Sequence, residues 1–178
     1  MNLAERRVHS DTIFEGKIIK VTKDQAELPD GSLASREVVN HPGGVCVLAL
    51  DEDSNVTLVK QFRYPIQQLL LELPAGKLEY GEEHGPAAVR ELSEETGLEA
   101  SEWTYLGYML SSPGFCTEKI HMYLARGLTR KKQHLDEGEF LDVLAVPFEE
   151  LIRQVMDGTI TDGKTVTAAL KTKVLLGL

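Results

Sequence analysis

The distribution of apolar and polar positions along the chain predicts strands separated by polar turns. Residues 45–50 form an almost continuous apolar run, which is the pattern of a strand buried on both faces. Further apolar runs of strand length follow, separated by turn-forming residues. We therefore predict main strands at residues 45–50, 56–61, 69–73, 104–110, 119–125 and 140–146.

The N-terminal third also predicts β-structure. Thr12–Val21 mixes β-branched and polar residues, and the turn signal P-D-G-S at 29–32 precedes a return strand at Ala34–Val39. The H-P-G-G sequence that follows interrupts the pattern. We therefore predict a small antiparallel β subdomain over residues 1–42 and a main domain over residues 43–178.

Three helices are predicted in the rest of the chain. The first opens with Pro86 at its first position, which suits proline because the missing N–H has no intrahelical partner there. It runs to Thr96, after which Gly97 can supply a left-handed cap. Two more helices are expected at 148–156 and 164–176. Together the elements predict the α+β class, with helices packed against a mixed sheet.

The charge balance is acidic, because 19 Lys and Arg residues face 28 Asp and Glu residues, for a net charge of −9. Nucleic-acid and anionic-membrane binders usually rely on basic surfaces, so the sequence argues against both partners. No apolar stretch approaches the roughly 20 residues of a membrane helix, and the charged start is not a signal peptide. Cys46 and Cys116 match no disulfide or metal-binding pattern. We expect a cytoplasmic protein.

Three acidic residues of the first predicted helix break the rules of helix stability. Glu91, Glu94 and Glu95 are spaced to share one helix face, where like charges repel. Glu94 and Glu95 also fall in the last turn, where the helix dipole disfavours anions. A divalent cation would compensate, since Mg²⁺ and Mn²⁺ prefer oxygen ligands. Taken alone, the pattern also fits a solvated acidic face.

Residues around this helix resemble a known motif. Gly76, Glu82 and the run R-E-L-S-E-E-T-G-L at 90–98 fill every defined position of the Nudix box, G-x5-E-x7-R-E-U-x-E-E-x-G-U, where U is aliphatic. On this resemblance the chain is identified as a member of the Nudix hydrolase superfamily. The resemblance implies an α/β/α sandwich, a Mg²⁺ site on the box helix and hydrolysis of a nucleoside diphosphate linked to another moiety.

The same resemblance implies a role for each residue of the box. Glu91 and Glu95 match the principal metal ligands, and Glu94 matches a third ligand or a residue that reaches the metal through water. Arg90 matches the residue that orients these carboxylates by ion pairing, and Glu82 matches one that steadies the preceding loop. The expected cofactor is Mg²⁺, with Mn²⁺ as an alternative.

Two segments before the helix resemble the ADP-ribose pyrophosphatases and related nucleoside diphosphate sugar hydrolases. They are Q-F-R at 61–63 and E-L-P-A-G at 72–76. Arg63 matches an arginine near the substrate phosphates, a role for which its rigid fork of donors is suited. A surface ion pair is the alternative for Arg63. Ala75 is expected at the metal site.

A segment after the helix resembles the same hydrolases. The sequence S-P-G-x-x-x-E at 112–118 matches an element whose marker is a proline at this distance after the box. Pro113, Gly114 and Glu118 are therefore candidates for substrate binding. Without the box, S-P-G would indicate only a turn.

The N-terminal segment resembles the β appendage of these hydrolases at E-G-K, 15–17, and R-E-V-V, 36–39. The resemblance implies a domain-swapped homodimer in which this region helps to hold the base. Arg36 could stack on a purine and Glu37 could accept a hydrogen bond from an exocyclic amine, with cross-strand charge pairing as the alternative. Ile18 stands where some relatives place a stacking aromatic residue.

A general base is expected in the polar loop D-E-G-E at 136–139, which looks like the catalytic loop of these hydrolases. Loops held on a rigid scaffold often carry catalytic groups. We favour Glu139 as the base that deprotonates the attacking water, with Glu137 as the second candidate. A solvated acidic loop without a catalytic role is the alternative.

The sequence therefore predicts a Mg²⁺-dependent nucleoside diphosphate sugar pyrophosphatase. ADP-ribose is the first substrate expected, with AMP and ribose 5-phosphate as products. GDP-mannose or UDP-glucose hydrolysis are close alternatives, and dinucleoside polyphosphate cleavage is a more distant one. A Nudix-fold sensor that binds a nucleotide sugar without cutting it is the alternative from another class.

Overall fold

The computed structural model describes residues 2–178, which divide into two compact units. The first unit ends at Gly43 and also contains the distant loop Leu110–Lys119. The loop is joined to the N-terminal segment by main-chain hydrogen bonds, from Val39 N to Phe115 O at 2.7 Å and from Thr117 N to Val39 O at 3.0 Å. The second unit comprises Gly44–Met109 and Ile120–Leu178.

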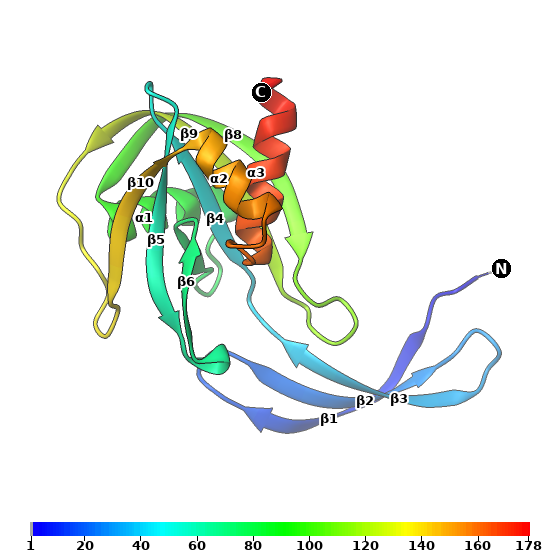
Figure 1. Cartoon of the computed structure of the whole chain (residues 1–178). Helices are drawn as coiled ribbons and strands as arrows, with labels where there is room; N and C mark the ends of the chain where they lie inside the picture. The colour runs from blue at the N-terminus through cyan, green and yellow to red at the C-terminus, as the bar shows by residue number, and fades with distance from the viewer. Residues whose placement is uncertain (1) are drawn as a thin grey trace. The chain divides into compact units, whose positions relative to one another are not determined.

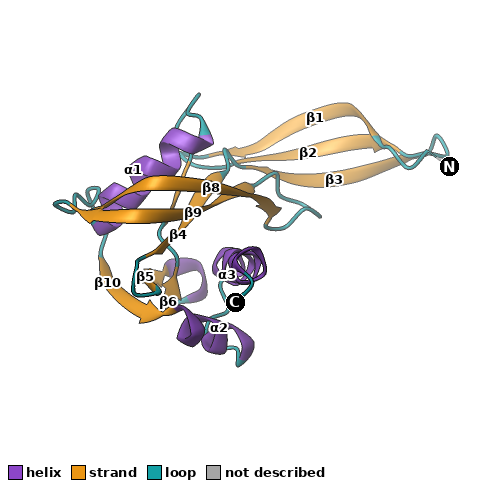
Figure 2. Ribbon diagram, turned by 90° about the horizontal axis from the view of Figure 1, so that it is seen from above, coloured by secondary structure: helices purple, strands orange, loops and turns teal. Residues whose placement is uncertain are grey.

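The first unit is built on a three-stranded antiparallel sheet. Its strands β1 (Arg6–Glu15), β2 (Lys20–Glu27) and β3 (Leu33–Asn40) lie side by side in chain order (Figure 2). The β-structure expected in this region is present, but the segment Thr12–Val21 spans the end of β1 and the start of β2. The chain turns between β1 and β2, where Gly16 N donates to Ile19 O at 2.9 Å. The turn predicted at 29–32 is present between β2 and β3, with Gly31 at a φ of 83°.

This sheet has almost no apolar interior of its own. Every residue of β1 is exposed, and the buried residues of the three strands are Thr22, Asp24 and Ala26. Both hydrophobic clusters of buried residues belong entirely to the second unit. A small sheet without a buried apolar face is at best marginally stable in isolation, so this unit needs a further surface to cover it.

The second unit is built on a mixed sheet with the central strand order β10-β5-β4-β9-β8. Strand β4 runs parallel to β9 but antiparallel to β5, and β6 and β7 extend the sheet by pairing with β5 and β4. The strands are β4 (Gly44–Leu50), β5 (Asn55–Arg63), β6 (Gln68–Glu72), β7 (Ala75–Lys77), β8 (Leu98–Leu110), β9 (Lys119–Arg130) and β10 (Leu141–Pro147).

Helices cover both faces of this sheet, with α1 (His84–Thr96) on one face and α2 (Phe148–Met156) and α3 (Gly163–Leu176) on the other (Figures 1 and 2). A short 3₁₀ turn over Tyr64–Ile66 follows β5. None of the helices in residues 2–178 has the length and apolar character that crossing a membrane requires.

The apolar run of β4 places it at the centre of the sandwich. Its side chains alternate, so that Val45, Val47 and Ala49 pack in the cluster under α1 while Cys46 and Leu48 pack in the cluster under α2 and α3. All of them are buried, as predicted for a strand covered on both faces. The predicted α/β/α sandwich with a mixed sheet is therefore confirmed.

Helix α1 ends as predicted but begins earlier. Glu83 is its N-cap residue, so Pro86 is the third helical residue rather than the first. The physical argument still applies, because the first four N–H groups of a helix lack intrahelical partners. Gly97 ends the helix at a φ of 68°, and its N–H donates to Ser93 O.

Candidate active site

The acidic face of α1 points into the protein rather than into solvent. Glu91 and Glu95 lie one turn apart and are only 9% and 3% exposed, whereas Glu94 is half-buried. Oε2 of Glu95 accepts a hydrogen bond of 2.8 Å from the main-chain N–H of Ala75 in β7. The observed burial rules out a freely solvated face for Glu91 and Glu95, because ionised carboxylates are rarely buried without a compensating partner.

The space for the Glu91 carboxylate exists because residue 76 is a glycine. A Cβ atom built on Gly76 would overlap all three atoms of that carboxylate group. Ala75 and Gly76 therefore form a cradle in which the main chain meets both buried carboxylates of α1. This gives the glycine of the motif a steric reason, since its φ is not in the left-handed region.

The electrostatics of the two buried carboxylates favour a cation between them. Burial raises the pKa of Glu95 to about 8, and the negative charges of Glu91 and Glu139 add to that shift, although the Ala75 N–H opposes it. Burial also raises the pKa of Glu91, with the Arg90 guanidinium counteracting it. Glu139 contributes to both shifts, which brings the candidate base into the electrostatic environment of these carboxylates.

Arg90 holds the acidic residues in place through every nitrogen of its guanidinium. Nε and Nη2 each donate to Glu82 at 2.9 Å, and Nη1 donates to Glu91 at 2.8 Å and to Glu94 at 2.9 Å. Nη2 also reaches Lys77 O at 3.4 Å. Arg90 is thus a clamp between the loop and the helix, which is the orienting role that the resemblance implied.

The donor chemistry of this cradle fits a divalent cation of the hard type, because the carboxylate oxygens of Glu91 and Glu95 meet there. Within residues 2–178, no three His, Cys, Asp or Glu side chains are already grouped so that they could hold a metal ion. Arg90 and the Ala75 amide hold the carboxylate oxygens instead. At least one of these contacts must open for Glu91, Glu94 and Glu95 to share an ion.

The loop after β9 caps the same helix and then carries Glu139. Gln133 Nε2 donates to Glu95 O at 2.6 Å and His134 N donates to Glu94 O at 3.1 Å, so the loop satisfies the last carbonyls of α1. Further along, Asp136 N donates to the Glu139 carboxylate at 3.3 Å. These contacts explain how a polar loop is held beside the acidic helix.

Glu139 lines a hollow of about 290 Å³, and Glu137 is not among the lining residues. Gln61 and Phe62 of β5 also line it. The side-chain amide nitrogen of Gln61 is buried and has no hydrogen-bond partner within residues 2–178. Of the two base candidates, only Glu139 lines this hollow, which a ligand could enter.

Arg63 forms an ion pair at the end of β5, but the pair is more than a surface contact. Nε donates to Oε1 of Glu72 at 2.7 Å and Nη2 donates to Oε2 at 2.6 Å, and the Glu72 side chain is 1% exposed. Lys164 of α3 contacts the same carboxylate. Sequence analysis assigned no role to Glu72 or Lys164, and Lys164 stands outside every motif that carried the resemblance.

The candidates for base recognition lie in the first unit. Nε and Nη2 of Arg36 donate to Glu5 at 2.9 and 2.6 Å, so its charge partner lies before β1. Glu37 is exposed on β3 opposite Lys23, and Ile18 is 50% exposed in the turn between β1 and β2. Their roles in binding a base stay predictions.

The loop between β8 and β9 carries the remaining candidates, which also stay predictions. Ser112 O accepts hydrogen bonds from the main-chain N–H groups of residues 115 and 116, and the turn leaves Pro113 and Gly114 exposed. Oε1 of Glu118 lies 3.4 Å from Nδ1 of His41.

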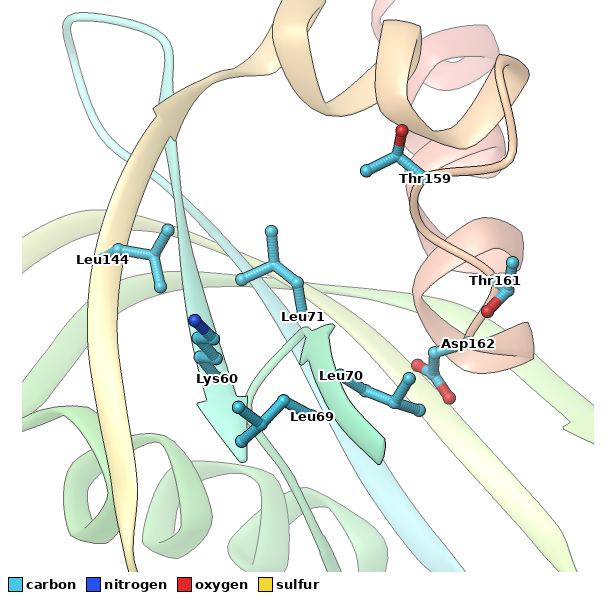
Figure 3. Close-up of a pocket in the computed structure, with 8 residues that line it drawn as sticks. All are labelled: Lys60, Leu69, Leu70, Leu71, Leu144, Thr159, Thr161 and Asp162. Carbon is cyan, nitrogen blue, oxygen red and sulfur yellow. The ribbon is translucent and has the colours of Figure 1, made fainter. Parts of the chain in front are cut away.

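A second hollow, of about 360 Å³, lies between the β5–β6 hairpin, β10 and the segment that connects α2 to α3 (Figure 3). Leucines of β6 and β10 make up half of its lining residues, and Lys60 contributes from β5. The connection between α2 and α3 closes it with Thr159, Thr161 and Asp162. No sequence motif pointed to it.

Comparison with known proteins gives matches over nearly the whole chain. A family model described as NUDIX domain matches residues 40–169, and one described as nucleoside diphosphate sugar hydrolase N-terminal domain matches residues 5–39. An ADP-ribose pyrophosphatase of Bacillus subtilis is 41% identical over 94% of this chain and 91% of its own. A methanol dehydrogenase activator of Bacillus methanolicus is 40% identical over 92% and 90%.

More distant matches agree with these. A GDP-mannose pyrophosphatase of Klebsiella pneumoniae is 35% identical over 77% of this chain and 75% of its own. A solved structure titled as that of an ADP compounds hydrolase superposes with a TM-score of 0.86 over 99% of this chain and 97% of that chain. At 21% sequence identity, that superposition establishes the fold alone.

Proposed function

The chain belongs to the Nudix hydrolase family, and we propose that it hydrolyses the pyrophosphate bond of nucleoside diphosphate sugars, with ADP-ribose as its preferred substrate. The observation that carries this proposal is the cradle of β7 and α1, where two buried carboxylates meet the main chain at Gly76. A protein that only bound its ligand would gain nothing from burying these charges together.

The preference for ADP-ribose is supported by the relatives. Those with the higher identities include ADP-ribose pyrophosphatases of two bacteria, whereas the GDP-mannose pyrophosphatases are 30–35% identical. GDP-mannose is therefore the second substrate to test, and UDP-glucose the third.

We assign Glu91 and Glu95 as the ligands of Mg²⁺, with Glu94 and the main chain at Ala75 completing the set; Mn²⁺ is the alternative ion. When bound, the ion would neutralise the diphosphate and lower the pKa of a coordinated water. Arg90 keeps the carboxylates aligned between turnovers through its contacts with Glu82, Glu91 and Glu94.

The chain's own residues then account for proton transfer and substrate orientation. Glu139 accepts the proton of the attacking water, whose oxygen bonds to one phosphorus while the P–O–P bridge breaks. With ADP-ribose, the two halves leave as AMP and ribose 5-phosphate. The exposed part of the Arg63 guanidinium donates to the phosphate oxygens.

We propose that the first unit makes a domain-swapped homodimer and contacts the base through Arg36, Glu37 and Ile18. The support is physical: the three-stranded sheet lacks an apolar core, and β1 exposes Val8, Ile13 and Phe14. A second copy of the chain would cover that surface. We place Pro113, Gly114 and Glu118 near the substrate on the resemblance described above.

We also propose that the enzyme acts in the cytoplasm on small molecules rather than on nucleic acid or at a membrane. Both cysteines are free thiols, as expected in a reducing compartment. Burial raises the pKa of Cys46 to about 12, which makes it a packing residue rather than a reactive one.

A substrate screen tests the function. Purified protein is incubated with ADP-ribose, GDP-mannose, UDP-glucose and diadenosine polyphosphates, with Mg²⁺ or with EDTA, and the nucleotide products are measured. We expect AMP and ribose 5-phosphate from ADP-ribose with Mg²⁺ and no product with EDTA. Glu95→Gln is the matched control, because it keeps the side chain's shape while removing its charge, and it should be inactive but folded.

Two results would contradict the proposal. A wild-type protein that cleaves none of these substrates is not a pyrophosphatase of this class. If it nevertheless binds ADP-ribose in calorimetry, it is a sensor. If Glu95→Gln keeps a near-normal rate, the metal site lies elsewhere.

A further inference from the structure

The two arginines of the active site use their guanidinium groups differently. All three nitrogens of Arg90 donate to carboxylates of the loop and of α1. Arg63 uses only its Nε–Nη2 edge, which grips Glu72. The structure gives Arg63 no other hydrogen bond within residues 2–178, and its side chain remains 39% exposed. The Nη1 edge of Arg63 is therefore available to a ligand, and the orientation of that edge depends on Glu72.

Glu72 is itself held from a distant part of the chain. Its side chain is 1% exposed, and the ammonium group of Lys164 contacts the oxygen that also accepts from Nη2 of Arg63. Lys164 lies in the first turn of α3 and is 9% exposed. Burial alone would raise the pKa of Glu72, but the bonds from Arg63 and the charge of Lys164 outweigh it and lower the pKa.

The position of Lys164 is fixed by the start of its helix. Asp162 is the N-cap residue of α3, where its carboxylate accepts from Thr165 N at 3.1 Å and from Thr165 Oγ1 at 2.6 Å. The same carboxylate lies 3.0 Å from Lys164 Nζ. Thr165 Oγ1 in turn accepts from the main-chain N–H of Leu73, next to Glu72, at 2.9 Å. The turn at the start of α3 is therefore bonded to the strand end that carries Glu72.

We propose that Glu72, held by Lys164 and Asp162, is a positioning residue that fixes Arg63 with its free edge toward the diphosphate of the substrate. This rests on the proposed function, in which Arg63 binds phosphate. The fork of Arg63 is planar and rigid, so gripping one edge orients the other. An arginine held in this way loses less conformational freedom when substrate binds, and that saving appears as affinity.

The chain also contains a reason for using two cations on one carboxylate. If the buried Glu72 carboxylate faced only Arg63, it would lose its partner whenever the substrate drew the guanidinium away. Lys164 keeps Glu72 paired in both situations, so Arg63 can contact phosphate without leaving a buried charge unpaired. The alternative is that the cluster only fastens α3 to the sheet and has no influence on substrate binding.

The test replaces the pair by apolar residues of similar size, Glu72→Leu with Lys164→Met. Such replacements of buried ion pairs are often neutral or stabilising, so the fold should survive, with a Tm near that of the wild type. We expect the Kd for ADP-ribose with a methylene group in place of the bridging oxygen to rise about 10- to 100-fold, because an oriented charged hydrogen bond is lost. The KM for hydrolysis should rise similarly, while kcat changes less.

A double-mutant cycle with Arg63→Ala shows whether the effect passes through Arg63. In the Arg63→Ala background, the double replacement should change Kd by no more than about twofold. Arg153→Met is the control, because it removes an arginine that is paired with Glu150 of α2 and with Asp157 just after that helix, outside the site, and it should leave Kd unchanged. If the double replacement does not fold, Glu72→Gln is measured instead, with the same expected result.

Three outcomes overturn the proposal: a double replacement with wild-type Kd, an equal loss in the Arg63→Ala background, or an Arg63→Ala variant that binds as tightly as wild type. The binding measurement does not need turnover. An inactive wild-type protein that still binds the analogue through Arg63 therefore refutes the hydrolase proposal and leaves the positioning role supported.

Discussion

Replacing Gly76 with alanine tests the geometry of the cradle most directly. The new Cβ would overlap the Glu91 carboxylate, which must move by roughly 1.5 Å to regain an ordinary separation of about 3.5 Å. The neighbour that must move is the end of a flexible side chain, so the main chain can stay in place. The substitution therefore displaces one functional group and little else.

The two effects of this change can be compared in magnitude. A displacement of about 1 Å in a catalytic group can cost 100-fold in rate, which corresponds to about 2.7 kcal/mol of transition-state stabilisation. A strained rotamer at Glu91 would lower the free energy of unfolding by about 0.5–1.5 kcal/mol. Alanine would raise it by about 0.4–1 kcal/mol, because it restricts the unfolded chain more than glycine does. We expect kcat/KM for ADP-ribose to fall at least about 100-fold while Tm changes by only a few degrees.

The assay is Mg²⁺-dependent release of AMP from ADP-ribose, with thermal unfolding of the same samples in EDTA. Gly85→Ala is the matched control, because a Cβ there would meet only the Tyr123 hydroxyl at an ordinary 3.6 Å. That variant should keep wild-type activity. If Gly76→Ala is as active as Gly85→Ala, the Glu91 carboxylate is not needed at its observed position, and the assignment of the metal site is refuted.

Three further outcomes are expected. Glu139→Gln should lower kcat about 100- to 10,000-fold with little change in KM, while Glu137→Gln stays near wild type; a pure KM effect would point to another base. Glu72 has a lowered pKa in the folded protein, so its contribution to stability is present at neutral pH and is lost progressively as pH falls below the ordinary glutamate pKa of 4.5. The Tm difference between wild type and Glu72→Gln should therefore shrink from pH 7 to pH 3. A difference that stays constant over this range would contradict a lowered pKa for Glu72. Light scattering should give twice the mass of one chain, since a monomeric protein would leave β1 uncovered.

The elements that sequence analysis predicted well are those whose signals lie among neighbouring residues. The apolar run at 45–50 specifies a strand covered on both faces, and Gly97 specifies where α1 ends. The spacing of Glu91 and Glu95 places both on one helix face because a helix repeats every 3.6 residues. Each of these features is determined by residues close together in the chain, so a short sequence pattern is sufficient to predict it.

The N-terminal sheet was predicted without its first turn and its central strand, and this has a physical cause. The turn between β1 and β2 lies inside the segment Thr12–Val21, where sequence analysis placed no turn, and Gly16 is the turn-forming residue of that segment. Strand β2 was missed because it is largely polar, with Thr22 and Asp24 rather than large apolar residues at its buried positions. Alternation of apolar and polar residues is a weak signal where the sheet has no apolar core to face.

The motif alone therefore accounts for which carboxylates line α1, and for the family to which the chain belongs. Only the tertiary structure shows that Glu91 and Glu95 are buried against β7, that Arg90 is fully used while Arg63 keeps one edge free, and that Lys164 reaches Glu72. Those contacts join residues far apart in the chain, and they depend on the pairing of β5 with β6 and on the docking of α3. No pattern among neighbouring residues encodes that docking, because it is decided by packing across the whole core.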